Sequence, residues 1–272
     1  MNSLALQNES ESKWKIDSSF KYDLLCFVNI LTGNDFYAKR FPNEFTMFHE
    51  KLSDSELKAL ENIDREIRIE NKGIISAMLC LYFSAVPDLT FDQIIERFEN
   101  FNLMKTNLQI AGYYSEDSWN SFISIKDDLK VVIEFLRDNG FLEYWSSNCK
   151  PLIDQRIKEV SNITDNFDIF VEVERITKIK KEPIPIEIFF LKFAKPHGMR
   201  IVGSAFITDI SWDNKITLRT AVHEMLHGNI DWESENMKQV IEILNEDDFV
   251  MDKVKNHNPA FGYNTLEGYL EE

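Results

Sequence analysis

The sequence predicts an α+β protein, in which a mainly helical N-terminal part precedes a region with a small mixed sheet and further helices. Over the first 165 residues, apolar side chains recur at the three- and four-residue spacing of helices. Later, β-branched and aromatic residues concentrate in short runs typical of strands. This order of elements suits the α+β class. A boundary near residue 165 would divide residues 1–165, a helical region of unassigned role, from residues 166–272. No flexible linker marks that boundary, so the two parts can also form one continuous domain.

The N-terminal helices are predicted from caps and apolar stripes. Asp17 and Ser18 precede a stripe that ends before Gly33, and we expect them to cap the first helix. The apolar run from 73 to 86 predicts a buried helix, and Pro87 ends it. None of these patterns indicates chemistry, because each is accounted for by a packed core.

Two capping-box patterns and one further stripe complete this part. Ser53 is followed three residues later by Glu56, and Thr90 is followed in the same way by Gln93. This spacing lets each side chain bond the backbone of the other residue at a helix start. A stripe of leucine, valine and isoleucine over residues 129–136 predicts another core helix.

The pattern changes after residue 165. Residues 167–179 fit a helix and a strand equally well, whereas residues 186–193 predict a strand. Residues 195–198 predict a turn, and residues 200–211 a second strand, for which the short connection allows antiparallel pairing with the first. A helix is predicted over residues 215–229.

Composition sets limits on function. Hydrophobic residues make up 44% of the 272 residues, which supports a sizeable core. The 46 acidic residues exceed the 30 basic ones, giving a net charge of −16, so nucleic acid is not an expected partner. Cys26, Cys80 and Cys149 form no CxxC pair and predict neither a cysteine zinc site nor a redox motif.

Location and assembly are only weakly constrained. No apolar run approaches the ~18 residues that a membrane span needs. Residues 1–13 are polar and lack the apolar segment of a secretory signal. The sequence as it stands therefore fits a cytoplasmic protein, and an exported one if a leader has been removed. Oligomeric state is not predicted.

The predicted helix over residues 215–229 carries the sequence H-E-M-L-H. His223 and His227 are four residues apart, so both imidazoles lie on one helix face. They can bind one ion at the ~2.0–2.1 Å that zinc takes from nitrogen. Glu224 lies beside them, and its carboxylate can reach a metal-bound water without binding the metal.

This arrangement suits hydrolysis by activated water. Zinc lowers the pKa of its bound water toward ~7 and polarises a carbonyl. Glu224 can then act as general base and pass the proton to the leaving amine. The chain has five histidines, and at this composition a chance match to the motif arises in roughly one such sequence in a hundred. The alternative is a helix whose two histidines merely pack or face water.

Residues 220–228, T-A-V-H-E-M-L-H-G, resemble the signature of the zincin metallopeptidases. The resemblance implies that His223 and His227 are zinc ligands, that Glu224 is the catalytic base, and that the substrate is a peptide or protein. Zn²⁺ would be the cofactor.

The same resemblance extends over residues 184–272 and says nothing about the N-terminal part. Zincins carry an edge strand before the motif helix that holds peptide substrate by backbone pairing, and residues 200–210 are similar in position. Asn229 departs from the family, which usually has an apolar residue there, but removes no catalytic group.

Zinc needs a third protein ligand that leaves a fourth position for water. Residues 231–234 lack the glycine and histidine of the metzincin pattern, which excludes that branch. The gluzincin resemblance implies a glutamate from a later helix, and Glu271 is the predicted ligand, with Glu267 and Glu272 as alternatives. A ligand helix normally needs further turns, so a longer natural chain or an incomplete site also stays open.

A side chain that donates to the transition state is expected opposite the base. By chemistry alone, the candidates are His257, Tyr263 and Tyr269, whereas His49 and His197 are interpreted as structural or exposed. Two alternative functions remain open. One is a non-catalytic interaction protein that keeps a zincin-like scaffold, with or without zinc. The other is a helical binding module in which the motif is accidental.

Overall fold

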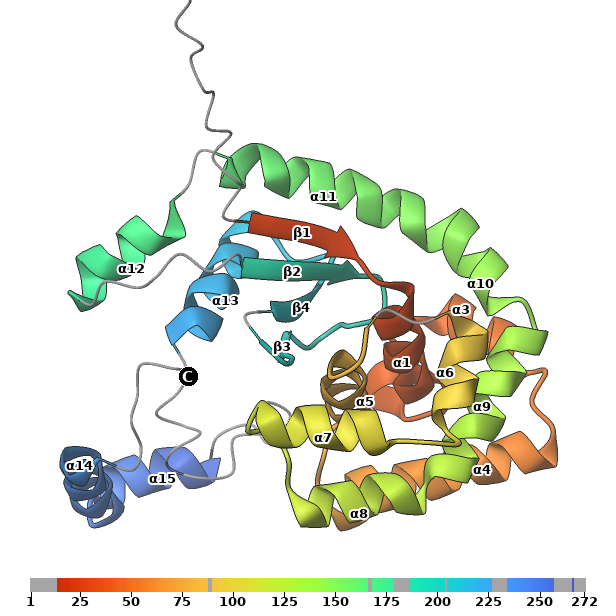
Figure 1. The fold of residues 1–272 in the computed structure, drawn as a ribbon, viewed down its shortest axis with the longest axis horizontal. Coiled ribbons are helices and arrows are strands. Elements are labelled where there is room, and N and C mark those ends of the chain that lie inside the picture. The colour runs from red at the N-terminus through yellow and green to blue at the C-terminus, as the bar shows by residue number, and fades with distance from the viewer. Residues whose placement is uncertain are drawn as a thin grey trace, which may run out of the picture.

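The structure is a computed structural model. It describes residues 14–87, 90–165, 168–178, 186–203, 205–226 and 234–256, together with Leu266. Helices surround a small four-stranded mixed sheet, which confirms the predicted α+β class (Figure 1). Within these ranges, no helix is long and apolar enough to cross a membrane.

The sheet has the strand order β1-β2-β4-β3. Three strands run parallel in its middle and at one edge, namely β1 (Trp14–Ser18), β2 (Ile186–Leu191) and β4 (Ala205–Asp209). The two-residue strand β3 (Met199–Arg200) pairs antiparallel with β4 and forms the other edge. All five side chains of β4 are buried, as expected for a parallel strand that is covered on both faces.

Three strand predictions are therefore wrong. Residues 200–211 form not one strand but the end of β3, a turn and β4, because the chain reverses at Gly203, whose φ of +88° favours glycine. The predicted antiparallel pairing with the first strand is also wrong, since β4 runs parallel to β2. The expectation that residues 200–210 form an edge strand is wrong as well, because β4, the strand that directly precedes the motif helix, lies in the interior of the sheet, and of these residues only Arg200 belongs to the edge strand β3.

The other described elements are helices. They are, in chain order, α1 (Phe20–Leu31), α2 (Asp35–Ala38), α3 (Pro42–His49), α4 (Asp54–Asp64), the π-helix η1 (Arg65–Glu70), α5 (Ile75–Ser84), α6 (Phe91–Arg97), α7 (Asn102–Ile110), α8 (Glu116–Ser124), α9 (Lys126–Asp138), α10 (Phe141–Tyr144), the π-helix η2 (Trp145–Cys149), α11 (Lys150–Thr164), α12 (Ile169–Thr177), α13 (Asn214–Leu226), α14 (Glu235–Asn245) and α15 (Asp248–Asn256).

Both capping boxes are confirmed, at the starts of α4 and α6. The ambiguous stretch after residue 165 is the helix α12. The first helix is capped by Ser19, whose side chain accepts from the backbone N–H of Tyr22. The prediction that Asp17 and Ser18 cap this helix is wrong, because both residues belong to β1.

The core joins the sheet to α1, which is almost entirely buried. The Phe27 ring contacts those of Phe48 and Phe141 from the helices, and also that of Phe193, which follows β2. Helix α11 packs against β1 and β2, while α13 contacts β4. Strand β1 and helix α1 come from the N-terminal part of the chain, so residues from both sides of position 165 share this sheet and core.

Candidate functional site

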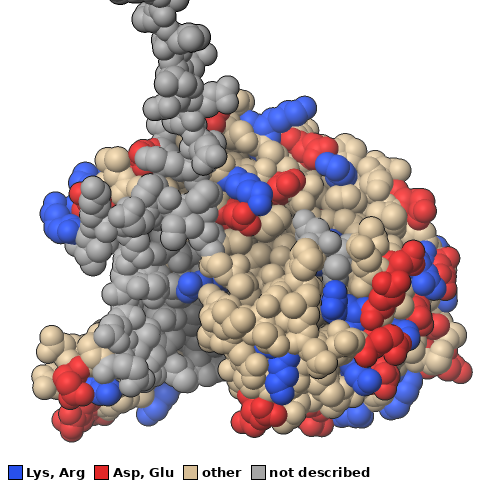
Figure 2. Space-filling model, in the orientation of Figure 1, with Lys and Arg blue, Asp and Glu red and all other residues tan. Residues whose placement is uncertain are grey.

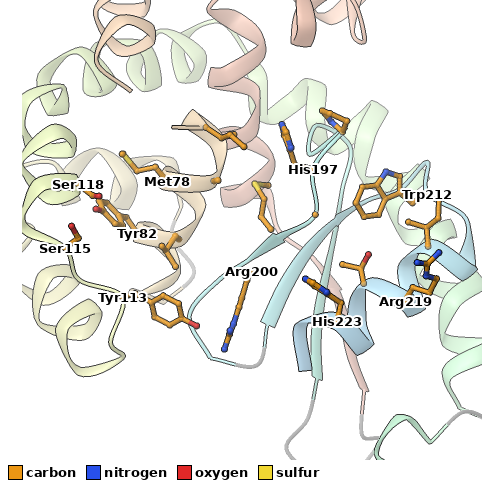
Figure 3. A pocket seen from close by; sticks show the side chains of 18 residues that line it. Met78, Tyr82, Tyr113, Ser115, Ser118, His197, Arg200, Trp212, Arg219 and His223 are labelled. Carbon is orange, nitrogen blue, oxygen red and sulfur yellow. The ribbon is translucent and has the colours of Figure 1, made fainter. Parts of the chain in front are cut away.

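A pocket of about 790 Å³ opens beside the edge strand of the sheet (Figure 3). Helix α5, the turn between α7 and α8 and the start of α8 form one wall. Residues 196–200, which include β3, form the floor, and α13 together with Trp212 forms the opposite wall. The described lining residues are Ile74, Ala77, Met78, Leu81, Tyr82, Tyr113, Ser115, Ser118, Pro196, His197, Gly198, Met199, Arg200, Trp212, Ile216, Arg219, Thr220 and His223.

His223 lies on α13 and lines this pocket, half-buried. The predicted motif helix is confirmed as far as Leu226. Glu224 belongs to the same helix, but its side chain is outside the described part of the structure, as are His227 and Glu271 altogether. One of the two predicted histidine ligands thus faces a pocket, and the ligand set remains a prediction.

The other candidates of the sequence also lie outside the described residues: Glu267, Glu272, His257, Tyr263 and Tyr269. Within the described ranges, no group of three histidine, cysteine, aspartate or glutamate side chains is arranged to hold a metal ion. The described residues therefore supply a single member of the predicted metal site.

Two buried carboxylates hold the segment that leads from β2 to the pocket floor. Asp23 of α1 accepts hydrogen bonds from the backbone N–H groups of Lys192 and Phe193, at 3.2 and 2.8 Å, and from Trp145 Nε1 at 2.7 Å. Asp209, at the end of β4, accepts from the N–H of Lys195 at 3.1 Å. The path of the chain into β3 is consequently fixed from two sides.

Burial is the largest influence on the pKa of both carboxyl groups. Loss of solvent raises the pKa of Asp23 to about 7, and the three N–H donors offset only part of that increase. Burial likewise raises the pKa of Asp209, against hydrogen bonds from Ser211 that lower it. Neither Asp23 nor Asp209 lines the pocket, so we assign both carboxyl groups a structural role.

The backbone at Gly198 lies close to the ring of Trp212 in the pocket floor beside α13. A Cβ placed on Gly198 would meet the Trp212 ring at 3.1 Å, so glycine lets the turn lie against this side chain. The carbonyl of Trp212 accepts from Arg156 Nη2 at 2.7 Å, and the Arg156 guanidinium lies over the Phe190 ring of β2. These contacts tie the start of α13 to the sheet.

His197 follows the cis peptide bond Lys195–Pro196 in the predicted turn. It is buried, and its Nε2 lies 3.0 Å from the hydroxyl of Tyr37. Burial, helped by the charge of Arg40, lowers the pKa of His197 to about 4, so its imidazole is neutral at pH 7. This agrees with the structural role expected from the sequence, although the side chain also lines the pocket.

The polar and aromatic side chains of the pocket that sequence reasoning missed include Tyr113, Arg200, Trp212 and Arg219. A signal existed for Arg219, because it precedes His223 by four residues and must share its helix face. Arg200 and Tyr113 come from segments that meet only in the folded chain, so their spacing in the sequence carries no such signal.

No family model matches the chain, and comparisons with curated proteins and with solved structures give no match. The resemblance to zincins accordingly rests on residues 220–228 and on the chemistry that they permit. Function has to be argued from the pocket and its side chains.

Proposed function

We propose that the protein is a zinc-dependent peptidase whose active site lies in the pocket between α5, β3 and α13. The observation that carries this proposal is that His223, the first residue of H-E-x-x-H, lines that pocket beside the sheet-edge strand. A histidine that merely packed in the core would have no access to a cavity able to admit a peptide segment.

The residues at the site fit the metal. An imidazole is a preferred zinc ligand, and the position of His227 one helical turn after His223 suits a second ligand on the same face. Glu271 is the proposed third ligand, with Glu267 and Glu272 as alternatives. When bound, Zn²⁺ would supply a Lewis acid that acidifies water and stabilises negative charge on the carbonyl oxygen.

The chain's own groups would then divide the remaining work. Glu224 takes a proton from the attacking water and delivers it to the amine nitrogen as the peptide bond breaks. The edge strand β3 offers backbone groups to an extended substrate. The apolar wall of α5, formed by Ala77, Met78 and Leu81, accepts a substrate side chain and limits water around the reacting carbonyl.

The purified chain is expected to bind about one zinc ion per molecule, since it contains one H-E-x-x-H motif. Metal analysis measures the stoichiometry, and a broad peptide library read by mass spectrometry measures cleavage before chelation, after chelation and after zinc is restored. His223→Ala should lose the zinc. His49→Ala, which removes an imidazole that packs against the Phe45 ring and does not line the pocket, is the matched control and should keep it.

Two results would count against the proposal. A chain that takes up no zinc, even on reloading, has no metal site of the kind described. A zinc-loaded chain that cleaves nothing in the library would instead support the interaction protein that keeps a zincin-like scaffold.

A further inference from the structure

The pocket differs in charge from the rest of the chain. The protein has 46 acidic and 30 basic residues, yet the eighteen described lining residues include Arg200 and Arg219 and not one aspartate or glutamate. On the face drawn in Figure 2, acidic side chains gather mainly over α6 and α9, while the middle of the face, over α5, is largely uncharged. Negative charge is thus kept away from the described pocket walls.

Arg200 presents its guanidinium to the pocket from the edge strand β3. It is exposed, and its Cζ lies 5.8 Å from the centre of the ring of Tyr113, in the turn between α7 and α8. A guanidinium held against a ring keeps its N–H groups available at the edge of its plane. Within the described part of the chain, Arg200 has no carboxylate partner that would already use those donors.

Arg219 approaches from α13. It precedes His223 by four residues, which puts the two side chains on one helix face with Cβ atoms ~5–6 Å apart. Arg219 is exposed, and among the described residues it too forms no ion pair. In Figure 3, Arg200 and Arg219 lie on either side of His223.

We infer that Arg200 and Arg219 provide two carboxylate-binding positions, one on each side of His223, so that the pocket selects peptides that carry a negative charge near the residues bound there. The inference deepens the proposed function, on which it rests for the identity of the ligand as a substrate. A single arginine with planar donors can bind a carboxylate by charge-assisted hydrogen bonds, so each position can act by itself. The overall negative charge repels acidic peptides at long range, so their selection would require positive charge inside the pocket.

The carboxylate has two possible sources, an acidic side chain or the C-terminus of the peptide. Matched peptides Ac-Ala-Ala-Phe-X-Ala-Ala-NH₂, with X as Glu, Gln or Lys, test the side chain. The Gln peptide with a free C-terminal acid tests the terminus. Binding is measured by calorimetry with the full chain carrying Glu224→Gln, so that no peptide is consumed during the titration.

The Glu peptide, or the free-acid peptide, is expected to bind about tenfold more tightly than the amidated Gln peptide, and the Lys peptide more weakly still. Arg200→Gln combined with Arg219→Gln should remove most of this preference, so that the Glu, free-acid and amidated Gln peptides bind with similar Kd values, and the two single variants show which arginine binds which carboxylate. Arg65→Gln, an exposed arginine of η1 outside the pocket, is the control and should keep the preference. High salt should reduce the preference.

Equal affinity for all four peptides, or no binding of any of them, would overturn the two carboxylate-binding positions. Circular dichroism on each variant separates lost binding from lost folding. Failure of the peptidase proposal would give a different result. If the protein prefers the acidic peptides but the wild type hydrolyses none of them, the carboxylate-binding positions are supported and the peptidase proposal is rejected.

Discussion

Glu224→Gln is expected to abolish peptide hydrolysis while zinc stays bound. A glutamine keeps the size and polarity of the side chain but cannot take a proton from water at neutral pH. Loss of a positioned general base costs about 10²- to 10⁴-fold in rate. The measurements are kcat for a cleaved library peptide and the zinc content of the same sample.

Glu242→Gln serves as the matched control, because Glu242 is exposed on α14 and outside the described pocket lining. It should retain wild-type activity. Unchanged hydrolysis by Glu224→Gln would exclude the proposed base. Loss of zinc together with activity would instead assign Glu224 a role in holding the metal.

Asp23→Ala is expected to be the most destabilising single substitution considered, lowering the free energy of unfolding by roughly 3 to 5 kcal/mol. The change removes the carboxylate that accepts from Trp145, Lys192 and Phe193, and leaves those N–H groups buried without an acceptor. Urea denaturation measures the loss. Asp17→Ala, at an exposed side chain of β1, is the control and should change stability by far less.

Asp23 also predicts a pH dependence with a definite sign. Its pKa is about 7 in the folded chain, mainly through burial, and 3.8 when unperturbed. Between these values the folded state binds the proton and the unfolded state does not, so this group's contribution to stability falls as pH rises from about 4 through 7. The contribution is fully present below pH 4 and is largely lost above pH 7.

Asp23→Asn isolates that contribution, because asparagine does not titrate. The stability advantage of the wild type over Asp23→Asn should shrink between pH 4 and pH 8, by roughly 4 kcal/mol at most. Denaturation curves at several pH values measure this difference. An advantage that stays constant, or grows with pH, would show that Asp23 is already ionised in the folded chain at low pH.

Local patterns predicted α1, α4, α5, α6, α9 and α13, because the determinants of these helices lie within one or two turns. The capping boxes of α4 and α6 and the apolar run of α5 are examples. The sheet was predicted less well. Strand β1 spans residues 14–18, and its aspartate and serine resemble a helix cap when the partner strand is unknown. The parallel pairing of β2 with β4 could not be predicted either, because it depends on the path that the chain takes between the two strands.

In the site, too, local features could be predicted from the sequence and long-range contacts could not. A four-residue spacing on one helix identified the motif, and the structure shows His223 on a pocket wall. The same spacing points to Arg219. Arg200 and Tyr113 are 87 residues apart, 200 minus 113, and only the packing of β3 against the helical wall brings them together. No local pattern encodes that contact.

The pairing of β1 with β2 affects when the sheet can form during synthesis. Lys15 and Glu187 pair across the two strands although 172 positions separate them. At translation speeds of about 5 to 20 residues per second, the first strand emerges roughly 10 to 30 s before its partner exists. Throughout that interval its unpaired edge is open to wrong pairings, including with another nascent copy. Assembly of the sheet must therefore wait for the last third of the polypeptide to leave the ribosome.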